Sequence, residues 1–266
     1  MLNFPYMPSP LDLFTQTSLS REIELPRKSP THSHTMSKKQ IIAMGGGGFS
    51  MEPENPLLDA YVVSACEKQQ PTIGLLPTAS GDSDWLISRF YRAFNKLPCR
   101  PKHLPLFRQP ADLEAEIAEC DAIYVTGGNT RNMLAIWNVC GMNTLLRDAW
   151  ERGVVLAGLS AGAICWFEQG HTDSTGKLSS MDCLGFLSGS CSPHYDGEAE
   201  REASYHEHMA SGLIGNGIAL DDGAAAHFVG TERKEIVTSR PAARAFEVSF
   251  TKGKINERSL PTRFLG

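Results

Sequence analysis

The stretch Gly158-Leu-Ser-Ala-Gly162 places a single serine, Ser160, between glycines at the end of an apolar run. Gly-x-Ser-x-Gly between a strand and a helix is the nucleophile-elbow pattern, in which a tight turn holds the serine hydroxyl clear of the backbone. The turn is crowded, so its neighbours must be small, as Ala161 and the two glycines are. N–H groups at the start of the following helix can stabilise an oxyanion beside the serine. The stretch therefore predicts a nucleophile at Ser160, although a bare GxSxG match often arises by chance.

A serine nucleophile needs a base that takes its proton. The chain has eight histidines, and a single histidine is usually a surface or core residue. His194 lies in the turn-rich segment SGSCSPHYDG, where Pro193 stiffens the chain before it. The residues alone do not select His194 from the other histidines.

An acidic residue should orient the base. The candidates after the elbow are Glu168, Asp173, Asp182 and Asp196. We expect Glu168 to end the helix that follows Ser160, and Asp173 to come just past it. Sequence spacing does not separate these candidates.

A second oxyanion donor should come from the end of a neighbouring strand. Gly127-Gly128-Asn129 follows the apolar run DAIYVT, and glycine lets the backbone approach a substrate closely. The same residues also read as a helix start that is capped by Asn129 and Thr130. The two interpretations are compatible.

Alternating short apolar runs and longer amphipathic runs must position these residues. We expect strands within 39–44, 72–76, 103–107, 121–126 and 154–160, and helices from 56, over 82–97, 111–120, 130–140 and 144–153. This alternation predicts an α/β fold with a doubly wound, mainly parallel sheet and helices on both faces. Ligands bind outside the carboxyl ends of such strands, where the glycine loops at 45–48, 127–128 and 158–162 all fall. Asp221-Asp222-Gly223 reads as a turn after a strand, with a substrate contact as the alternative.

Three motifs in this order, AIYVTGGNT, GLSAGA and SPHY, resemble the peptidase E family of aspartyl dipeptidases, which is related to cyanophycinases. The similarity runs from about Lys38 to the C-terminus. The resemblance implies a class I glutamine amidotransferase-like α/β fold, in which a serine replaces the cysteine of that superfamily.

The resemblance also implies roles for individual residues. Ser160 would be the nucleophile and His194 the general base, and the N–H groups of Gly128 and Ala161 would form the oxyanion hole. Asp173 in HTDS is the nearest match to the family's acid. Relatives with a glutamate as the third member keep Glu168 as the alternative.

Substrate recognition is the last property that the resemblance implies. In the dipeptidases an arginine after the histidine reads the aspartate side chain, and Arg201 is the candidate here. The implied reaction is acyl transfer through Ser160 on small peptides, with Asp at the N-terminus, without a metal or an organic cofactor. A cyanophycinase-like hydrolysis of β-aspartyl linkages is the close variant.

Two hypotheses from other classes stand beside this one. The glycine loops could cradle a small anion in a non-catalytic binding module, although they do not match a dinucleotide fingerprint. Cys165 could be the nucleophile of a glutaminase-type enzyme, but its place inside a helix is more typical of a buried hydrophobic residue.

The composition limits the remaining classes. The 266 residues are 41% hydrophobic and carry a net charge of −5, which gives no basic footprint for nucleic acid. No apolar run reaches the roughly 20 residues of a membrane span, and seven irregularly spaced cysteines indicate a reducing, cytoplasmic setting. We expect residues 1–37, rich in Pro, Ser and Thr, to be a disordered extension, and 38–266 to be a single domain. Whether the extension is physiological and whether the chain forms a homodimer are left open.

Overall fold

A computed structural model describes residues 38–266 of the protein, apart from residues 109 and 111. The predicted disordered extension over residues 1–37 lies outside the described residues. The predicted division into an extension and a single domain therefore stays a prediction.

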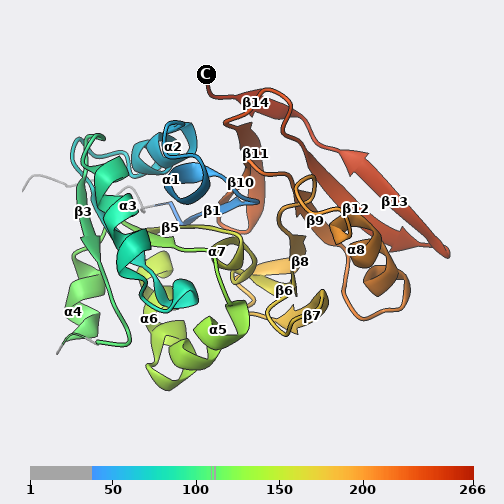
Figure 1. The fold of residues 1–266 in the computed structure, drawn as a ribbon, viewed down its shortest axis with the longest axis horizontal. Helices are drawn as coiled ribbons and strands as arrows, with labels where there is room; N and C mark the ends of the chain where they lie inside the picture. The colour runs from blue at the N-terminus through green and yellow to red at the C-terminus, as the bar shows by residue number, and fades with distance from the viewer. Residues whose placement is uncertain (1–37, 109, 111) are drawn as a thin grey trace, which may run out of the picture. The chain divides into compact units, whose positions relative to one another are not determined.

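An eight-stranded sheet forms the centre of the described part (Figure 1). Its order is β14-β11-β10-β1-β5-β4-β2-β3, and strands β1 to β5 all run parallel. The strands are β1 (Gln40–Met44), β2 (Thr72–Leu76), β3 (Arg100–His103), β4 (Ala122–Val125), β5 (Val155–Leu159), β10 (Ala224–Val229), β11 (Glu232–Thr238) and β14 (Thr262–Phe264). The predicted strand over 103–107 is misplaced, because β3 ends at His103 and a loop follows.

Strand β1 is buried on both faces, as its unbroken apolar sequence predicts. It pairs with β5 in parallel and with β10 in antiparallel register. Ile41 and Ala43 belong to one hydrophobic cluster, whereas Ile42 and Met44 belong to another on the opposite face. Alternate side chains therefore tie the same strand to two separate layers.

Helices cover both faces of this sheet, which confirms the predicted α/β class. Leu58 of α2 and Phe90 of α3 pack on one face, and Trp137 of α5 and Leu146 of α6 pack on the other. The helices are α1 (Gly48–Met51), α2 (Leu57–Ala65), the 3-10 helix η1 (Thr78–Ser80), α3 (Asp84–Phe94), α4 (Leu113–Ala118), α5 (Thr130–Val139), α6 (Met142–Glu151) and α7 (Ala161–Ile164).

A second sheet of six strands follows the elbow, in a region where the sequence predicts only irregular structure before the terminal strands. Its order is β13-β12-β9-β8-β6-β7. The strands are β6 (Phe167–Thr172), β7 (Ser179–Asp182), β8 (Leu187–Ser192), β9 (Gly217–Leu220), β12 (Ala245–Thr251) and β13 (Lys254–Ser259). Short, polar strands such as LSGSCS lack the apolar alternation that makes a strand recognisable.

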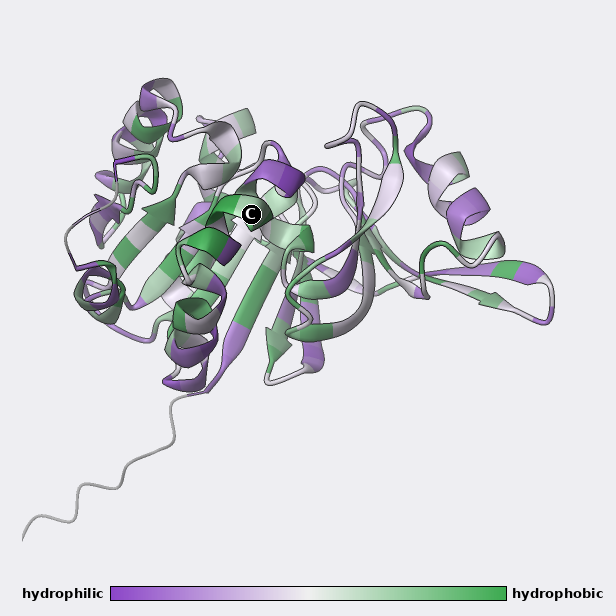
Figure 2. Ribbon diagram, turned by 90° about the horizontal axis from the view of Figure 1, so that it is seen from below, coloured by the Kyte–Doolittle hydropathy of each residue, from purple (hydrophilic) through white to green (hydrophobic). Residues whose placement is uncertain are grey.

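Helix α8 (Arg201–Ala210) packs on this second sheet. Tyr205 and Met209 of the helix join Phe246 and Val248 of β12 in a third hydrophobic cluster. Figure 2 shows hydrophobic strands inside the large sheet and a paler, more hydrophilic hairpin of β12 and β13 that extends beyond it. None of the helices within 38–266, residues 109 and 111 aside, is long and apolar enough to cross a bilayer.

Candidate active site

Ser160 stands at the sharp turn between β5 and α7, as the elbow pattern predicts. Its backbone angles are φ 54° and ψ −113°, in the left-handed half of conformational space that residues with side chains rarely adopt. Its N–H donates a hydrogen bond of 3.0 Å to the carbonyl of Met44 at the end of β1. Such strain persists only where the surroundings enforce it, and it is typical of functional positions.

Small residues around Ser160 are required by the packing of the turn. A Cβ atom on Gly158 would lie 2.3 Å from the carbonyl oxygen of Gly162, so strand and helix touch backbone to backbone. Helix α7 is only four residues long, and the chain enters β6 at Phe167. The expectation that Glu168 ends this helix is therefore wrong, because Glu168 lies on a strand.

His194 reaches the same end of β1 from the second sheet. It follows β8 by two residues, and its N–H donates to the carbonyl of Gly45 at 3.2 Å. The carbonyls of Met44 and Gly45 are consecutive, so Ser160 and His194 are anchored on neighbouring residues of one strand end. Figure 1 shows β8 beside α7, which agrees with this placement.

The acid that pairs with His194 is Asp222. His194 Nδ1 and Asp222 Oδ1 are 2.7 Å apart, and the two side chains are 16% and 12% exposed. Asp222 follows β9 by two residues, and β9 is the parallel neighbour of β8. The carboxyl ends of parallel neighbours meet at one edge of a sheet, which brings Asp222 to the histidine.

The prediction that Asp173 or Glu168 orients His194 is wrong for the same reason. Asp173 leaves β6 on the other side of β8 and is exposed in a turn, where its carbonyl accepts from Gly176 N–H. Glu168 lies near the start of β6, and its carboxylate accepts the N–H of Gly189 at 2.8 Å. Asp222 is not among the acids predicted to orient His194, although Asp-Asp-Gly after an apolar strand is the signal for it.

Neighbouring acidic residues hold Asp222 in place and differ from it in role. Asp196, a candidate acid in the sequence, accepts the N–H of Asp222 at 2.8 Å. Asp221 turns away and accepts the N–H of Arg244 at 2.8 Å. Burial raises the pKa of Asp221 to about 6. The three carboxylates therefore divide into one partner for His194 and two groups that fix the turn.

The glycine loop after β1 provides space for the His194–Asp222 pair. A Cβ atom on Gly46 would lie 2.0 Å from Asp222 Oδ1 and 2.9 Å from His194 Nδ1. The backbone of the loop is therefore packed directly against the pair, and any side chain at this position would displace it.

The second glycine loop lies beside the serine, where a second oxyanion donor is expected. The Cβ position of Gly127 is 3.3 Å from Ser160 Cβ, and Gly128 has a φ of 137°. Asn129 instead caps α5: its Oδ1 accepts from Asn132 N–H at 2.9 Å and its Nδ2 donates to the Ser174 carbonyl at 3.1 Å. The capping interpretation of Asn129 is confirmed, and the side chain is fully engaged there.

Arg201 does not face a substrate in this structure. It begins α8, its side chain is 3% exposed, and Nε donates to Glu198 Oε2 at 2.9 Å. Nη1 donates to the carbonyl of His171 at 3.1 Å. The prediction that Arg201 reads an acidic side chain is therefore wrong, because the guanidinium is buried and paired within the fold.

Cys165 is fully buried and does not present a nucleophile. Burial raises the pKa of its thiol well above the ordinary value of 9.0, so the reactive thiolate is disfavoured. The interpretation of Cys165 as a small buried hydrophobic residue is confirmed.

The protein resembles known proteins over most of its length. A model of the family described as peptidase family S51 matches residues 41–236. The Bacillus subtilis protein named "Uncharacterized peptidase YgaJ" is 53% identical over 229 residues, which cover 86% of this chain and all of that protein. A cyanophycinase of Synechococcus elongatus is 24% identical over 186 residues, which cover 65% of this chain and 56% of that protein.

A solved structure supports the fold. The crystal structure of a peptidase from an acI-B1 Actinobacterium aligns with a TM-score of 0.62, at 17% identity, over 85% of this chain and 96% of that chain. The resemblance that the three sequence motifs indicate, in both family and fold, is confirmed.

Proposed function

Because the chain belongs to peptidase family S51 and is a peptidase, we propose that it works through an acyl-enzyme on Ser160. The observation that carries this proposal is the hydrogen-bonded His194–Asp222 pair, anchored on β1 beside the strained serine turn. Nδ1 of His194 is held by Asp222, so Nε2 is the nitrogen left for the serine proton. Serine, base and acid then form a Ser160–His194–Asp222 triad.

The reaction follows from these positions. Ser160 Oγ attacks the scissile carbonyl carbon while His194 Nε2 takes the hydroxyl proton. The N–H groups of Gly128 and Ala161 stabilise the oxyanion, since the first N–H groups of a helix lack partners within it. The C–N bond then breaks, His194 gives the proton to the leaving amine, and an ester on Ser160 remains. Water, deprotonated by His194, hydrolyses the ester and restores the serine.

We propose small peptides with an N-terminal aspartate as substrates, and we assign their recognition to Arg240 in place of Arg201. Nε of Arg240 donates to Glu52 at 2.8 Å, and its side chain is 38% exposed. The hydrogen bond with Glu52 and the nearby charges of Asp222 and Asp196 raise the pKa of Arg240. Its position near Asp222 puts an accessible cation within reach of an acidic substrate group.

A second candidate reaction is the hydrolysis of β-aspartyl linkages. It is favoured by the similarity to the Synechococcus elongatus cyanophycinase, which extends over 65% of this chain. The same triad would serve this reaction, because only the group that carries the scissile carbonyl differs.

The test compares the wild type with Ser160→Ala on Asp-Xaa, Glu-Xaa, Ala-Xaa and β-Asp-Xaa peptides, with release of free amine as the readout. We expect the substitution to lower kcat by at least about 10⁴-fold on whichever peptide the wild type hydrolyses. The exposed helix residue Ser88, as Ser88→Ala, is the matched control and should keep full activity. Equal hydrolysis by wild type and Ser160→Ala would overturn the mechanism. Binding of the peptides by both proteins without turnover would favour the binding-module hypothesis.

The same set of peptides also distinguishes between the two candidate substrate classes. Arg240→Gln should raise KM for Asp-Xaa and leave Ala-Xaa unchanged, because only the acidic side chain loses a charged partner. Activity on β-Asp-Xaa alone would select the second candidate reaction.

A further inference from the structure

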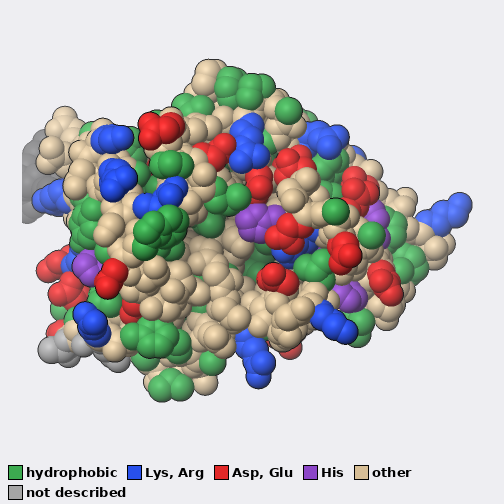
Figure 3. Space-filling model, in the orientation of Figure 1, with side chains coloured by type: hydrophobic (Ala, Val, Ile, Leu, Met, Phe, Trp, Pro, Cys, Tyr) green, Lys and Arg blue, Asp and Glu red, His purple; other side chains and the backbone are tan. Residues whose placement is uncertain are grey.

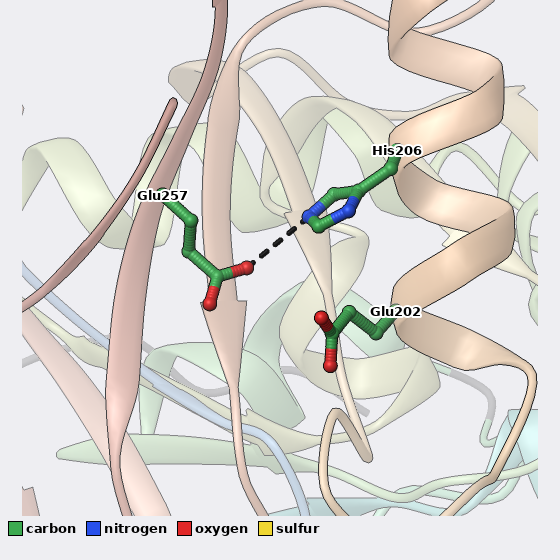
Figure 4. Close-up of side chains that lie close together, drawn as sticks. All are labelled: Glu202, His206 and Glu257. Atoms are coloured by element: carbon green, nitrogen blue, oxygen red, sulfur yellow. Dashed lines mark hydrogen bonds and ion pairs between the residues drawn. The ribbon is translucent and has the colours of Figure 1, made fainter. Parts of the chain in front are cut away.

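A cluster of three metal-ligating side chains lies apart from the triad, between α8 and β13. Glu202 and His206 are four residues apart on α8 and therefore project from one face of the helix. Glu257 faces them from β13 (Figure 4). One carboxylate or imidazole atom from each residue lies within 4.8 Å of the others.

We propose that Glu202, His206 and Glu257 bind a divalent zinc ion. One imidazole nitrogen and two carboxylate oxygens are ordinary zinc ligands, at about 2.0–2.2 Å from the ion, with water at the fourth position. Tetrahedral ligands at that distance are about 3.3–3.6 Å apart, so ligand atoms that now lie up to 4.8 Å apart must approach one another by about 1 Å. His206 Nε2 and Glu257 Oε2 already lie 3.1 Å apart.

The ligands are held by structure on two sides. Helix α8 is fixed by the buried Tyr205 and Met209, and β13 is paired with β12, where Glu257 lies opposite Val248. The hydroxyl of Tyr195 donates to Glu257 Oε2 at 2.6 Å and lies 3.0 Å from His206 Nε2, so it orients both the carboxylate and the imidazole. Support of this kind around metal ligands increases affinity by holding them in place.

The electrostatics of the site favour a cation. Two carboxylates face a single imidazole, and Figure 3 shows Asp, Glu and His side chains gathered over the α8 end of this face. The neighbouring Arg258 is paired with Glu247 instead. The side chains of His206 and Glu257 are each 26% exposed, so an ion can enter from solvent.

The ion would act on the proposed active site through Tyr195. Tyr195 directly follows His194, its N–H donates to the carbonyl of Leu220, and Asp222 lies two residues further on. Zinc on Glu257 and His206 would therefore stiffen the segments that carry the proposed base and acid. The metal takes no part in the acyl transfer, and its binding can be tested whether or not the proposed function holds.

The test measures Zn²⁺ binding to the full chain by equilibrium dialysis, with metal analysis, and by the thermal unfolding midpoint. The wild type should bind one more Zn²⁺ than His206→Gln or Glu257→Gln, whose affinity at this site should fall at least about 10-fold. Zn²⁺ should raise the unfolding midpoint of the wild type and not of these variants, because a ligand of the native state stabilises it. Glu207→Gln, an exposed change on the same helix, is the matched control and should bind as the wild type does.

The comparison between variants removes the contribution of the seven free cysteines, which are the same in all four proteins. Circular dichroism checks that the variants are folded. Identical zinc stoichiometry and affinity in all four proteins would place the ion elsewhere and overturn the proposal. Absence of zinc binding by the folded wild type would overturn it as well.

Discussion

The two sheets contribute to the proposed site in different ways. The eight-stranded sheet supplies Ser160 on a strained backbone turn, packed through glycines against neighbouring strand ends. The six-stranded sheet supplies His194 and Asp222, which meet through a side-chain hydrogen bond between loops 28 residues apart. The proposed nucleophile is therefore positioned by main-chain geometry, and the side chain of the proposed base by a pairing of distant side chains.

The two sheet regions also differ in the pKa shift of a buried ionisable group. Asp59 of α2 lies under the glycine loop of the large sheet, where desolvation raises its pKa to about 7 despite a hydrogen bond from Tyr124. His171 of β6 lies in the second sheet, where desolvation lowers its pKa to about 3 and its two nitrogens meet Ser192 and Ser204. Burial favours the neutral form of both groups, but the two make stability depend on pH in opposite directions.

Apart from the loss of Ser160 itself, the largest effect should come from breaking the pair that the second sheet supplies. Asp222→Asn should lower kcat/KM by about 10³–10⁴-fold, because an amide favours the wrong histidine tautomer and does not stabilise the imidazolium. Steady-state hydrolysis of the best peptide measures this. Asp173→Asn and Glu168→Gln are the controls and should stay within a few-fold of the wild type. A comparable fall in either control would reassign the acid.

The next largest effect concerns how stability depends on pH in the large-sheet region, and the variant Asp59→Asn tests it. The native carboxyl binds a proton between its unfolded pKa of 3.8 and its folded pKa of about 7, so wild-type stability falls as pH rises through this window. The free energy of unfolding of the variant, relative to the wild type, should rise by about 3 kcal/mol between about pH 5 and pH 8. Urea denaturation at both pH values measures it. A pH-independent difference would mean that Asp59 is ionised in the fold.

In the second sheet, His171 should make the free energy of unfolding depend on pH in the opposite direction. The unfolded imidazole takes up a proton below its ordinary pKa of 6.5, whereas the folded one stays neutral down to about 3. Wild-type stability from this group is therefore complete above pH 6.5 and declines as pH falls. Between about pH 8 and pH 5 this group should lower the free energy of unfolding of the wild type by about 2 kcal/mol, and His171→Gln should remove that loss. The same urea titrations measure it. Parallel curves for the two proteins would contradict the assignment.

The smallest effect separates capping from catalysis at Asn129. Asn129→Ala should lower the free energy of unfolding by about 1 kcal/mol, because the first turn of α5 loses its side-chain acceptor. The value of kcat/KM should change by less than a few-fold, since the amide is engaged in the cap. A large loss of activity at unchanged stability would give Asn129 a direct role in substrate binding.

The features that could be predicted from the sequence are those that local main-chain patterns determine. Apolar runs and glycine loops located the turn at Ser160 and all of the parallel strands except β3. The second sheet and Asp222 escaped prediction because they depend on which strands become neighbours, and polar strands such as β8 carry no period that reveals this. The interpretation of Arg201 failed similarly, since the sequence does not show that the start of α8 lies against β6, where the carbonyl of His171 accepts from the buried guanidinium.

Strand β1 has a consequence for how the enzyme can lose activity. Consecutive carbonyls at its end hold Ser160 on one side and His194 on the other, and its residues Ile41 to Met44 are fully buried. The two carbonyls that hold the proposed nucleophile and the proposed base are therefore separated by one peptide unit of nearly fixed length. Because β1 is a buried strand within the large sheet, we expect inactivation by heat to coincide with global melting. The remaining activity would then measure the fraction of molecules that are still folded.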